Sequence, residues 1–326
     1  MTDRGSELDH RPLGQSGLMV SAVGIGCNAF GARIDAEQTT AVVDAAIDAG
    51  VTLFDTADVY GGEPGLSETL LGRALGGRRD DVVIATKFGG DMRGANGPDW
   101  GARGSRRYVR RAVETSLQRL GTDWIDHYQL HTPDPITPIA ETLSALAELV
   151  TEGKVRYIGS SNLAGWQVVD ADWTAHTAGQ PAFVSAQNKY SLYDRSADAE
   201  LIPACEQVGV DLLPYFPLEY GLLTGKYRRG QAAPAGSRLA IPAQAQRLEG
   251  ADFDRIEALT AYADERGISL LDVAIGGLVA QPFVGSVIAG VTTPDQVKAN
   301  VEAGRWLPDQ DDLDALDEVT AWDVAR

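Results

Sequence analysis

Four side chains able to assist proton transfer follow three apolar runs of the sequence. Asp55 and Tyr60 lie in the stretch FDTADVYG. Lys87 lies near the end of VVIATKFGG, and His131 ends WIDHYQLH. A carboxylate, a phenol, an ammonium and an imidazole in one place can protonate a carbonyl oxygen while a hydride reaches the carbonyl carbon. No side chain carries a hydride, so this chemistry implies a bound nicotinamide.

The four residue types have complementary roles in such a reaction. A phenol with a pKa of about 10 is a weak proton donor at neutral pH. We expect Lys87 to lower the pKa of Tyr60, and Asp55 to keep Lys87 charged and oriented. His131, as a neutral imidazole, would orient the carbonyl oxygen. Each of these residues alone is more often structural or solvated, but no fold requires all four at successive strand ends.

The apolar runs that carry these residues belong to a series of eight buried strands, each followed by a helical stretch. The strand segments are 21–27, 52–57, 82–88, 124–131, 155–162, 183–190, 210–216 and 286–291. Alternating strands and helices predict a parallel sheet, and eight units predict a closed (β/α)8 TIM barrel. An N-terminal β-hairpin and extra C-terminal helices are also expected. An open doubly wound sheet is the alternative, but GIGCNAFG lacks the third glycine of a dinucleotide-binding loop.

The length, the composition and the absence of a linker predict a single cytoplasmic domain. The 326 residues are 44% hydrophobic, and no linker divides residues 11–326; residues 1–10 are expected to be a flexible leader. The net charge of −18 argues against nucleic-acid and anionic membrane partners. No run approaches the roughly 18 apolar residues that span a bilayer. Cys27 and Cys205 lie far apart, which favours a reducing compartment over a disulfide framework.

Seven motifs in order resemble the aldo-keto reductase superfamily. They are FDTADVYG, ATKFG, DHYQLHTPDP, IGSSN, AQNKYS, YFPLEYGLLTGKY and IAGVTTPDQVKAN. The similarity is greatest to the branch of bacterial reductases and potassium-channel β-subunit-like proteins, and it covers residues 11–302. The resemblance implies an NADPH-dependent reductase of a small-molecule carbonyl substrate, with Tyr60 as general acid. It also leaves a second reading, a nicotinamide-binding regulatory or channel-associated subunit with little turnover.

The resemblance also assigns the residues that bind the cofactor. They are Gly26, Cys27, Asn28, Ser161, Asn162, Gln187, Tyr215, Phe216, Pro217, Leu218, Gly221, Leu223, Gly225, Lys226, Arg238, Gly290, Thr292, Gln296 and Asn300. Ser161, Asn162 and Gln187 would meet the nicotinamide carboxamide, and Tyr215 would stack on its ring. Residues 218–226 would wrap the pyrophosphate. The structural alternative is that Ser161 and Asn162 cap the following helix.

Departures from the family pattern concern mainly the phosphate of NADPH. The segment GVTTPDQ after the last strand has neither Lys nor Arg before Lys298, so the usual charged partners of the 2′-phosphate are missing there. Thr292, Thr293 or Arg238 would have to replace them. NADPH is the expected cofactor, and NADH is the alternative. Phe216 also stands where serine is commoner.

Further departures and candidates lie around the mouth of the barrel. Cys27 and Asn28 replace a common Thr-Trp pair, and Thr132 stands where Arg is common. Phe30, Phe88 and Trp100 are the candidate apolar contacts of the substrate. No metal site is expected.

Two other groups are expected to be structural. His127 lies on the same strand face as His131 and is expected to be a core histidine. Arg106, Arg107, Arg110 and Arg111 are expected to form a solvated helix face.

Overall fold

A β-hairpin opens the fold and closes one end of a barrel. The computed structural model describes residues 7–321. Strands β1 (His10–Pro12) and β2 (Met19–Ser21) pair antiparallel, as predicted. Leu13 packs in an apolar cluster with Leu53 and Ala85, near the beginnings of barrel strands. Leu8 is already buried, so packed chain begins before the expected boundary at residue 11; residues 1–6 of the expected leader lie outside the described residues.

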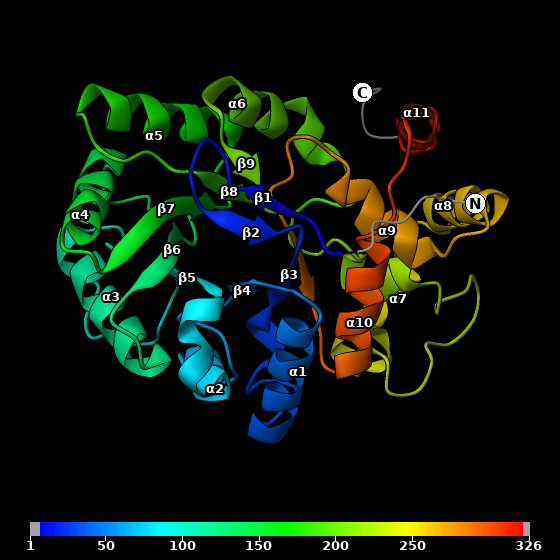
Figure 1. Cartoon of the computed structure of the whole chain (residues 1–326), viewed down its shortest axis with the longest axis horizontal. Helices are drawn as coiled ribbons and strands as arrows, with labels where there is room; N and C mark the ends of the chain where they lie inside the picture. Colours follow the sequence, from blue (N-terminus) through cyan, green and yellow to red (C-terminus); the bar gives the residue numbers. More distant parts are fainter. Residues whose placement is uncertain (1–6, 322–326) are drawn as a thin grey trace.

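Eight parallel strands form one curled sheet, which confirms the predicted barrel (Figure 1). Its members are β3 (Val23–Gly26), β4 (Leu53–Asp55), β5 (Val83–Phe88), β6 (Ile125–Leu130), β7 (Val155–Ser161), β8 (Ser185–Gln187), β9 (Asp211–Leu212) and β10 (Val287–Gly290). The order is β10-β3-β4-β5-β6-β7-β8-β9. Parallel bridges from Leu212 to Val284 and from Tyr215 to Ile288 join the two edge strands. The sheet therefore closes on itself and leaves no free edge.

Several strands are shorter than the apolar runs that predicted them. β9 covers two residues of the predicted segment 210–216, because Pro214 has no N–H to donate to a ladder. Beyond it, Tyr215 returns to the sheet only through isolated bridges, to Lys189 and Ile288. The apolar pattern therefore locates each strand, while backbone geometry sets its length.

Helices surround the strands (Figure 1). They are α1 (Ala36–Asp48), α2 (Leu66–Leu75), α3 (Arg106–Leu120), α4 (Ile139–Thr151), α5 (Gly165–Thr177), α6 (Leu201–Val208), α7 (Ala245–Glu249), α8 (Phe253–Arg266), α9 (Leu270–Val279), α10 (Pro294–Ala303) and α11 (Gln310–Val319). The start of α1 is fixed by a capping box, in which Asp35 accepts from the Gln38 amide and Gln38 accepts from the Asp35 amide. Each orphan amide satisfied in this way stabilises the helix end.

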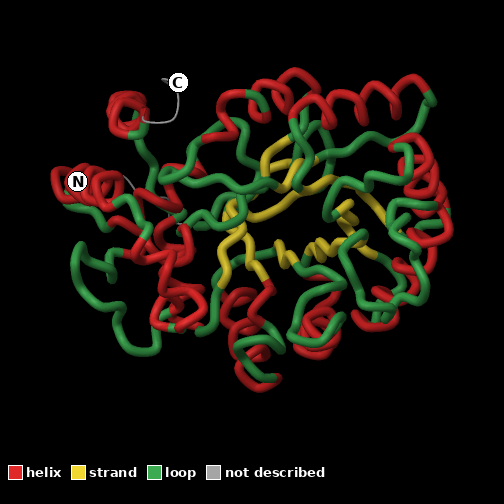
Figure 2. Tube along the Cα trace, turned by 180° about the vertical axis from the view of Figure 1, so that it is seen from behind, coloured by secondary structure: helices red, strands yellow, loops and turns green. Residues whose placement is uncertain are grey.

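The longest connection between barrel strands runs from β9 to β10. It contains two full helices, α8 and α9, and in addition the short helix α7. Figure 2, which shows the opposite side of the molecule, has the loop before α7 projecting beside the barrel. α11 follows α10 as an extra C-terminal helix, also as predicted. No helix among residues 7–321 is both long and apolar enough to cross a membrane.

Candidate active site

The four candidate catalytic residues come from neighbouring strands at one end of the barrel. Asp55 is the last residue of β4, and Tyr60 lies in the loop that follows it. Lys87 is the penultimate residue of β5, and His131 directly follows β6. β4, β5 and β6 are adjacent and parallel. The strand order therefore places the four residues together, although 76 positions separate the first and last of them in the sequence (131 − 55).

Asp55 and Lys87 form a buried ion pair at the bottom of the site. Lys87 Nζ donates to Asp55 Oδ2 at 2.6 Å and to the Thr56 carbonyl at 2.9 Å. The other carboxylate oxygen accepts from the side-chain amides of Gln187, at 2.8 Å, and Gln129, at 3.1 Å. Burial alone would lower the pKa of Lys87, but the Asp55 carboxylate and Tyr60 outweigh it, and the pKa is raised. The lysine is therefore an ammonium at neutral pH.

Tyr60 lies between this pair and His131. Lys87 Nζ is 5.1 Å from the centroid of the Tyr60 ring, and the His131 ring meets it edge-on at a centroid distance of 5.7 Å. Burial raises the pKa of Tyr60, and the charge of Lys87 only partly counters it. The net direction is opposite to the lowering expected from the sequence. The reason is that a phenolate would lose its hydration here and would also face the Asp55 carboxylate.

The backbone around Tyr60 is tightly constrained. The Ser67 amide donates to the Tyr60 carbonyl at 3.2 Å. Gly61 has φ +116°, and a Cβ at this position would lie 2.6 Å from the Ser67 nitrogen. Only glycine suits this turn, which links the Tyr60 loop to the start of α2.

His131 is held as a neutral imidazole. Burial, assisted by the charge of Lys87, lowers its pKa to about 3. Its backbone amide donates to the Phe88 carbonyl at 2.8 Å, and the Asn162 side chain donates to its carbonyl at 2.9 Å. Its Nδ1 is buried and has no hydrogen-bond partner among the described residues. The backbone of His131 is thus held on both sides, and its neutral ring keeps a free nitrogen that can direct a substrate oxygen.

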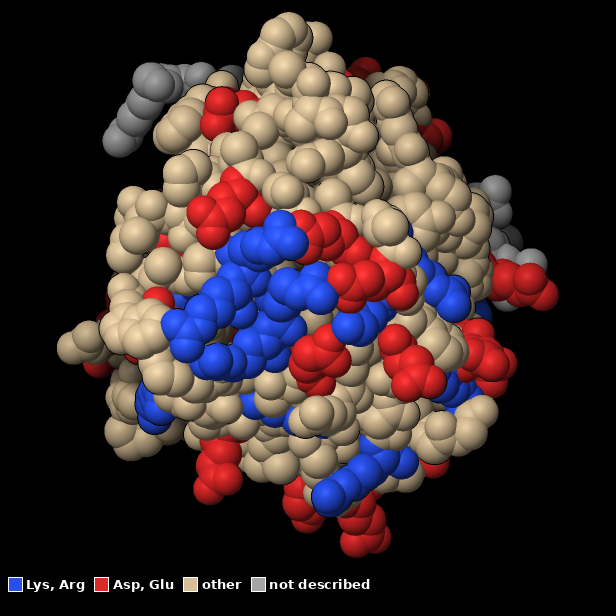
Figure 3. All heavy atoms as spheres, turned by 90° about the vertical axis from the view of Figure 1, so that its left-hand side faces the viewer, with Lys and Arg blue, Asp and Glu red and all other residues tan. Residues whose placement is uncertain are grey.

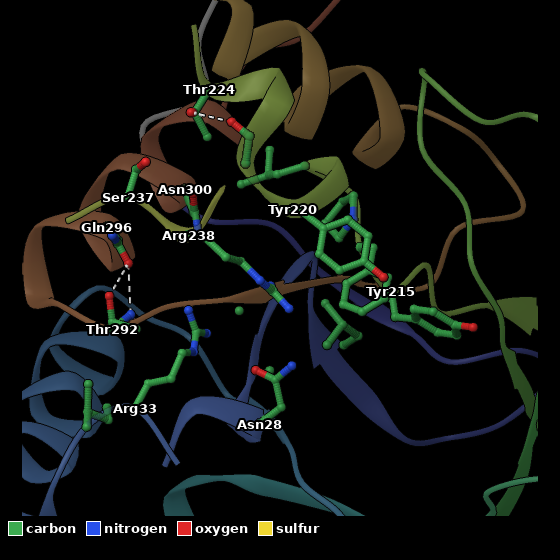
Figure 4. A pocket seen from close by; sticks show the side chains of 18 of the residues that line it. Asn28, Arg33, Tyr215, Tyr220, Thr224, Ser237, Arg238, Thr292, Gln296 and Asn300 are labelled. Carbon is green, nitrogen blue, oxygen red and sulfur yellow. Dashed lines mark hydrogen bonds between the residues drawn. The ribbon is translucent and has the colours of Figure 1, made fainter. Parts of the chain in front are cut away.

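A cavity of about 1170 Å³ opens above these residues (Figure 4). Tyr60 and His131 line its inner end. Most positions assigned to the cofactor by resemblance also line it: Gly26, Asn28, Ser161, Asn162, Gln187, Tyr215, Phe216, Pro217, Leu218, Gly221, Lys226, Arg238, Gly290, Thr292, Gln296 and Asn300. Cys27, Leu223 and Gly225 do not, and the first two are fully buried. The volume suits a dinucleotide, since single drug-sized ligands occupy about 300–1,000 Å³.

At the inner end, the residues assigned to the carboxamide are tied to one another. The Tyr215 hydroxyl donates to Asn162 Oδ1 at 2.8 Å, and Asn162 Nδ2 donates to the Ser161 hydroxyl at 3.0 Å. The Ser161 hydroxyl in turn donates to the Gln187 carbonyl at 2.7 Å. The alternative of helix capping does not hold, because Ala164 is the N-cap residue of α5. These contacts hold the Tyr215 ring at the cavity wall.

The segment from Phe216 to Gly221 lines the middle of the cavity in a strained conformation. Phe216, Glu219 and Tyr220 have φ values of +57°, +42° and +58°, and Gly221 has φ +96°. Lys189 anchors the segment through an ion pair with Glu219, at 2.9 Å. Non-glycine residues in the left-handed region cluster at binding sites. The phenyl ring of Phe216 packs against the Tyr220 ring, with 4.4 Å between the ring centroids.

At the outer end, the two hydroxyls expected to hold a phosphate are already used. The Thr292 amide and hydroxyl both donate to Gln296 Oε1, at 2.8 and 3.1 Å. The Thr293 hydroxyl accepts from the Gln296 amide and caps α10. Arg33, which sequence reasoning missed, also lines this end. Its position in the loop after the first barrel strand, at the C-terminal edge of the sheet, was the signal that could have found it.

None of the three candidate substrate contacts lies in the cavity wall. Phe30 and Phe88 are 0% exposed and belong to the main core, where Phe88 stacks on Tyr128 at 4.8 Å. Trp100 is 72% exposed and lies under the guanidinium of Arg107. The two phenylalanines pack in the main hydrophobic core. Burying an apolar ring there is more favourable in free energy than exposing it to water at the mouth of the barrel.

The two groups expected to be structural lie outside the cavity lining. His127 is fully buried, its Nε2 is 3.0 Å from the Ser185 hydroxyl, and burial lowers its pKa to about 3. On α3, Arg106 and Arg110 pair with Glu148 of α4. Figure 3 shows Lys and Arg gathered into a patch on this side of the molecule, bordered by Asp and Glu. Within residues 7–321, no group of three or more His, Cys, Asp or Glu residues could hold a metal ion.

Comparisons with known proteins show the family of the chain. Residues 22–321 match the model of the aldo/keto reductase family. The uncharacterized oxidoreductase YrpG of Bacillus subtilis is 35% identical over 318 residues, which cover 96% of each chain. A probable voltage-gated potassium channel subunit beta of Oryza sativa is 34% identical over 92% of each chain. The L-glyceraldehyde 3-phosphate reductase of Escherichia coli is 33% identical over 92% of this chain and 89% of its own.

Proposed function

Because the chain belongs to the aldo/keto reductase family, and is thus an oxidoreductase by family, we propose that it reduces small aldehydes and ketones to alcohols with NADPH. The observation that carries the proposal is the position of Tyr60 at the inner end of the cavity, between the Lys87 ammonium and the neutral His131. A proton donor, a cation and a neutral imidazole thus lie together at the inner end of the cavity. That is the arrangement needed at a carbonyl oxygen that gains negative charge.

Two further observations support a nicotinamide dinucleotide as the cofactor. The cavity is long enough to reach from the catalytic residues to α10, and Asn28 Oδ1, in its wall, is buried without a partner among the described residues. When bound, a reduced nicotinamide supplies the hydride. Tyr215 would face its ring, and Gly221 would let the backbone approach its phosphates, since an added Cβ there would lie 3.3 Å from Lys226 Nζ.

The side chains of this protein would manage the proton. His131 orients the carbonyl oxygen towards Tyr60, and Tyr60 donates its phenolic proton to that oxygen as negative charge develops. Lys87, held charged by Asp55, stabilises the phenolate that remains. The raised pKa of Tyr60 keeps the phenol protonated at neutral pH. The proton is therefore available for reduction, and solvent returns it after the alcohol leaves.

A regulatory, channel-associated role is the second candidate. It is favoured by the 34% identity to a protein whose name describes a channel subunit. The two candidates differ in turnover, because a regulatory subunit needs to bind the nicotinamide but not to reduce a substrate. Binding of NADPH without reduction of any member of a panel of small aldehydes and ketones would favour the second candidate.

The Tyr60→Phe variant tests the proposed role of the phenol. General acid catalysis contributes about 10²- to 10⁴-fold, so kcat for carbonyl reduction should fall by at least about 100-fold. NADPH affinity should change little, because the ring remains. Tyr157→Phe is the matched control, since Tyr157 packs with the cluster beneath the hairpin at the opposite end of the barrel. If Tyr60→Phe keeps its rate within about tenfold of the wild type, Tyr60 is not the general acid.

A further inference from the structure

A buried polar network lies behind Tyr60 and has no part in the proposed proton transfer. Its members are Asp58, Glu68, Asn96 and Arg119; the first three are buried, and the Arg119 side chain is 15% exposed. None of the four lines the cavity. Polar groups are costly to bury, so a network that touches no ligand needs another explanation.

Asp58 connects this network to two of the candidate catalytic residues. It lies two positions before Tyr60 in the same loop, and its backbone amide donates to the Lys87 carbonyl at 3.1 Å. Val59, between Asp58 and Tyr60, packs closely on the next loop, since a Cβ added at Gly90 would lie 2.6 Å from Val59 Cγ1. A displacement of Asp58 would therefore move Tyr60 relative to Lys87.

Asn96, in the loop between β5 and α3, holds the side chain of Asp58. Its Nδ2 donates to Asp58 Oδ2 at 3.1 Å, and its Oδ1 accepts from Arg119 Nη2 at 3.0 Å. The reverse orientation of the amide would place an oxygen against the carboxyl group and a donor against the guanidinium. Arg111 Nη1 also donates to the Asn96 carbonyl, at 3.3 Å. Two arginines of α3 thus fix Asn96, and Asn96 fixes Asp58.

The other end of the network returns to the strand that carries Lys87. Arg119 Nη1 pairs with Glu68 Oε2 at 3.1 Å, and Glu68 Oε1 accepts from the Thr86 hydroxyl at 2.7 Å. Thr86 directly precedes Lys87 on β5, and Glu68 lies in the first turn of α2, after the Tyr60 loop. The network is therefore a closed series of contacts that starts and ends on β5.

Asp58 is an unfavourable choice if the network only stabilises the fold. Its Oδ1 is buried without a hydrogen-bond partner among the described residues, and an unpaired buried acceptor destabilises the folded state. Burial raises the pKa of Asp58, and the charge of Glu68 raises it further. The charge of Arg119 and the hydrogen bond from Asn96 oppose this only in part. A group that is costly to bury is expected to hold another in place, and the chain leads from Asp58 to Tyr60 within two residues.

We propose that Asp58 and Asn96 are positioning residues for Tyr60: their contact fixes the Tyr60 hydroxyl relative to Lys87 and couples it to the loop between β5 and α3. This rests on the proposed function, in which Tyr60 is the general acid. Loss of the contact should slow proton transfer and leave cofactor binding intact, because the network lies outside the cavity lining. The contact needs an acceptor at position 58 and not a charge, so an amide oxygen there should suffice.

The test compares variants that remove the contact with one that keeps it. Asn96→Leu and Asp58→Ala remove it; Asp58→Ala removes the buried acid as well, so it remains informative if Asn96→Leu does not fold. Asp58→Asn keeps an oxygen that can accept from Asn96. Thr142→Val is the matched control, because the buried Thr142 hydroxyl donates to the Gly104 carbonyl at 2.9 Å and holds the other end of the same loop.

The expected result is a change in kcat without a change in cofactor affinity. In Asn96→Leu and Asp58→Ala, kcat for carbonyl reduction should fall by about 10- to 100-fold, because a displacement of about 1 Å has an effect of this size. In Asp58→Asn and Thr142→Val, kcat should stay within about threefold of the wild type. The dissociation constant of NADPH should stay within about threefold in every variant.

Fluorine NMR of protein labelled with fluorotyrosine follows Tyr60 independently of turnover, and Tyr60→Phe assigns its resonance. Loss of the contact should shift or broaden this resonance, whereas Asp58→Asn and Thr142→Val should leave it unchanged. An unchanged resonance in Asp58→Ala would overturn the inference. Losses of kcat in Asp58→Asn or Thr142→Val as large as in Asp58→Ala would overturn it too, since they would assign the effect to charge or to the loop as a whole. If the wild type reduces no carbonyl, the proposed function fails, and the Tyr60 resonance alone decides the inference.

Discussion

Replacing Asp55 with Asn tests how the buried pair at the centre of the site is held together. Lys87 Nζ lies 2.6 Å from Asp55 Oδ2, and the two side chains are 0% and 3% exposed. Asn keeps an oxygen acceptor for Gln129 and Gln187 but removes the negative charge, which leaves the ammonium buried and uncompensated. Breaking a buried ion pair from one side costs about 3–5 kcal/mol.

Deprotonation of Lys87 limits this cost and makes it depend on pH. With an ordinary lysine pKa of about 10.4, releasing the proton costs about 4.6 kcal/mol at pH 7 and about 1.9 kcal/mol at pH 9. In the wild type the pKa of Lys87 is raised, so its contribution is complete below about pH 10 and is lost only above that. In the variant the folded lysine becomes neutral once releasing its proton costs less than leaving the ammonium uncompensated, which the two values above place at about pH 7 to pH 8. Above that pH the unfolded chain binds one more proton, so the stability of the variant increases with pH and the difference between the two proteins should shrink by about 1.4 kcal/mol per pH unit up to about pH 10.

The measurement is equilibrium unfolding in guanidinium chloride at pH 7, 8 and 9, followed by the fluorescence of the six tryptophans. Asp44→Asn is the control, because Asp44 pairs with Arg78 at 2.7 Å on the exposed surface. Its effect should be about 0–1 kcal/mol at every pH. The reasoning is refuted if Asp55→Asn costs less than about 1 kcal/mol at pH 7, or if the cost stays constant from pH 7 to pH 9.

Two further predictions concern proton availability and the support behind the site. Because the pKa of Tyr60 is raised, kcat for carbonyl reduction should be constant from about pH 6 to pH 9. Alcohol oxidation needs the phenolate, so kcat for that direction should rise with pH. A reduction rate that falls through neutral pH would contradict this prediction. Arg119 Nη1 lies 3.1 Å from Oε2 of Glu68, whose side chain is 0% exposed, so Arg119→Met should lower the free energy of unfolding by about 3–5 kcal/mol. A loss within the range of a surface pair, about 1 kcal/mol or less, would show that Glu68 finds another partner.

The sequence predicted the barrel because its signal is local and repeated. Each strand is an apolar run long enough to be buried on both faces, and each helix repeats its apolar residues at helical spacing. The exact end of a strand depends on residues such as Pro214, which has no N–H to donate to a neighbouring strand. The apolar pattern alone does not show where a strand ends. The N-terminal hairpin was predicted as well, and residues 19–21 do pair with residues 10–12.

The candidate site was predictable to the extent that function follows strand ends. Asp55, Lys87 and His131 each mark the end of a run, so their common location follows from the parallel sheet. The direction of the Tyr60 pKa was not predictable, because it depends on how completely the folded barrel removes water from the phenol. Phe30 and Phe88 were predicted at the mouth of the barrel, but both are in the core. The sequence does not show whether an apolar residue in a loop or at a strand end faces the pocket or packs into the core.

What the sequence determined by itself is the set of elements and the chemical groups at their ends, since both depend on residue type and on spacing along the chain. What only the tertiary structure decided is which groups from distant elements share one space. Arg33 and Arg238 are 205 positions apart (238 − 33) and belong to different connections of the barrel. Closure of the sheet between β9 and β10 brings those connections to opposite sides of one cavity. Arg33, which nothing in the sequence singles out, thereby lies opposite Arg238 at the outer end of the cavity (Figure 4).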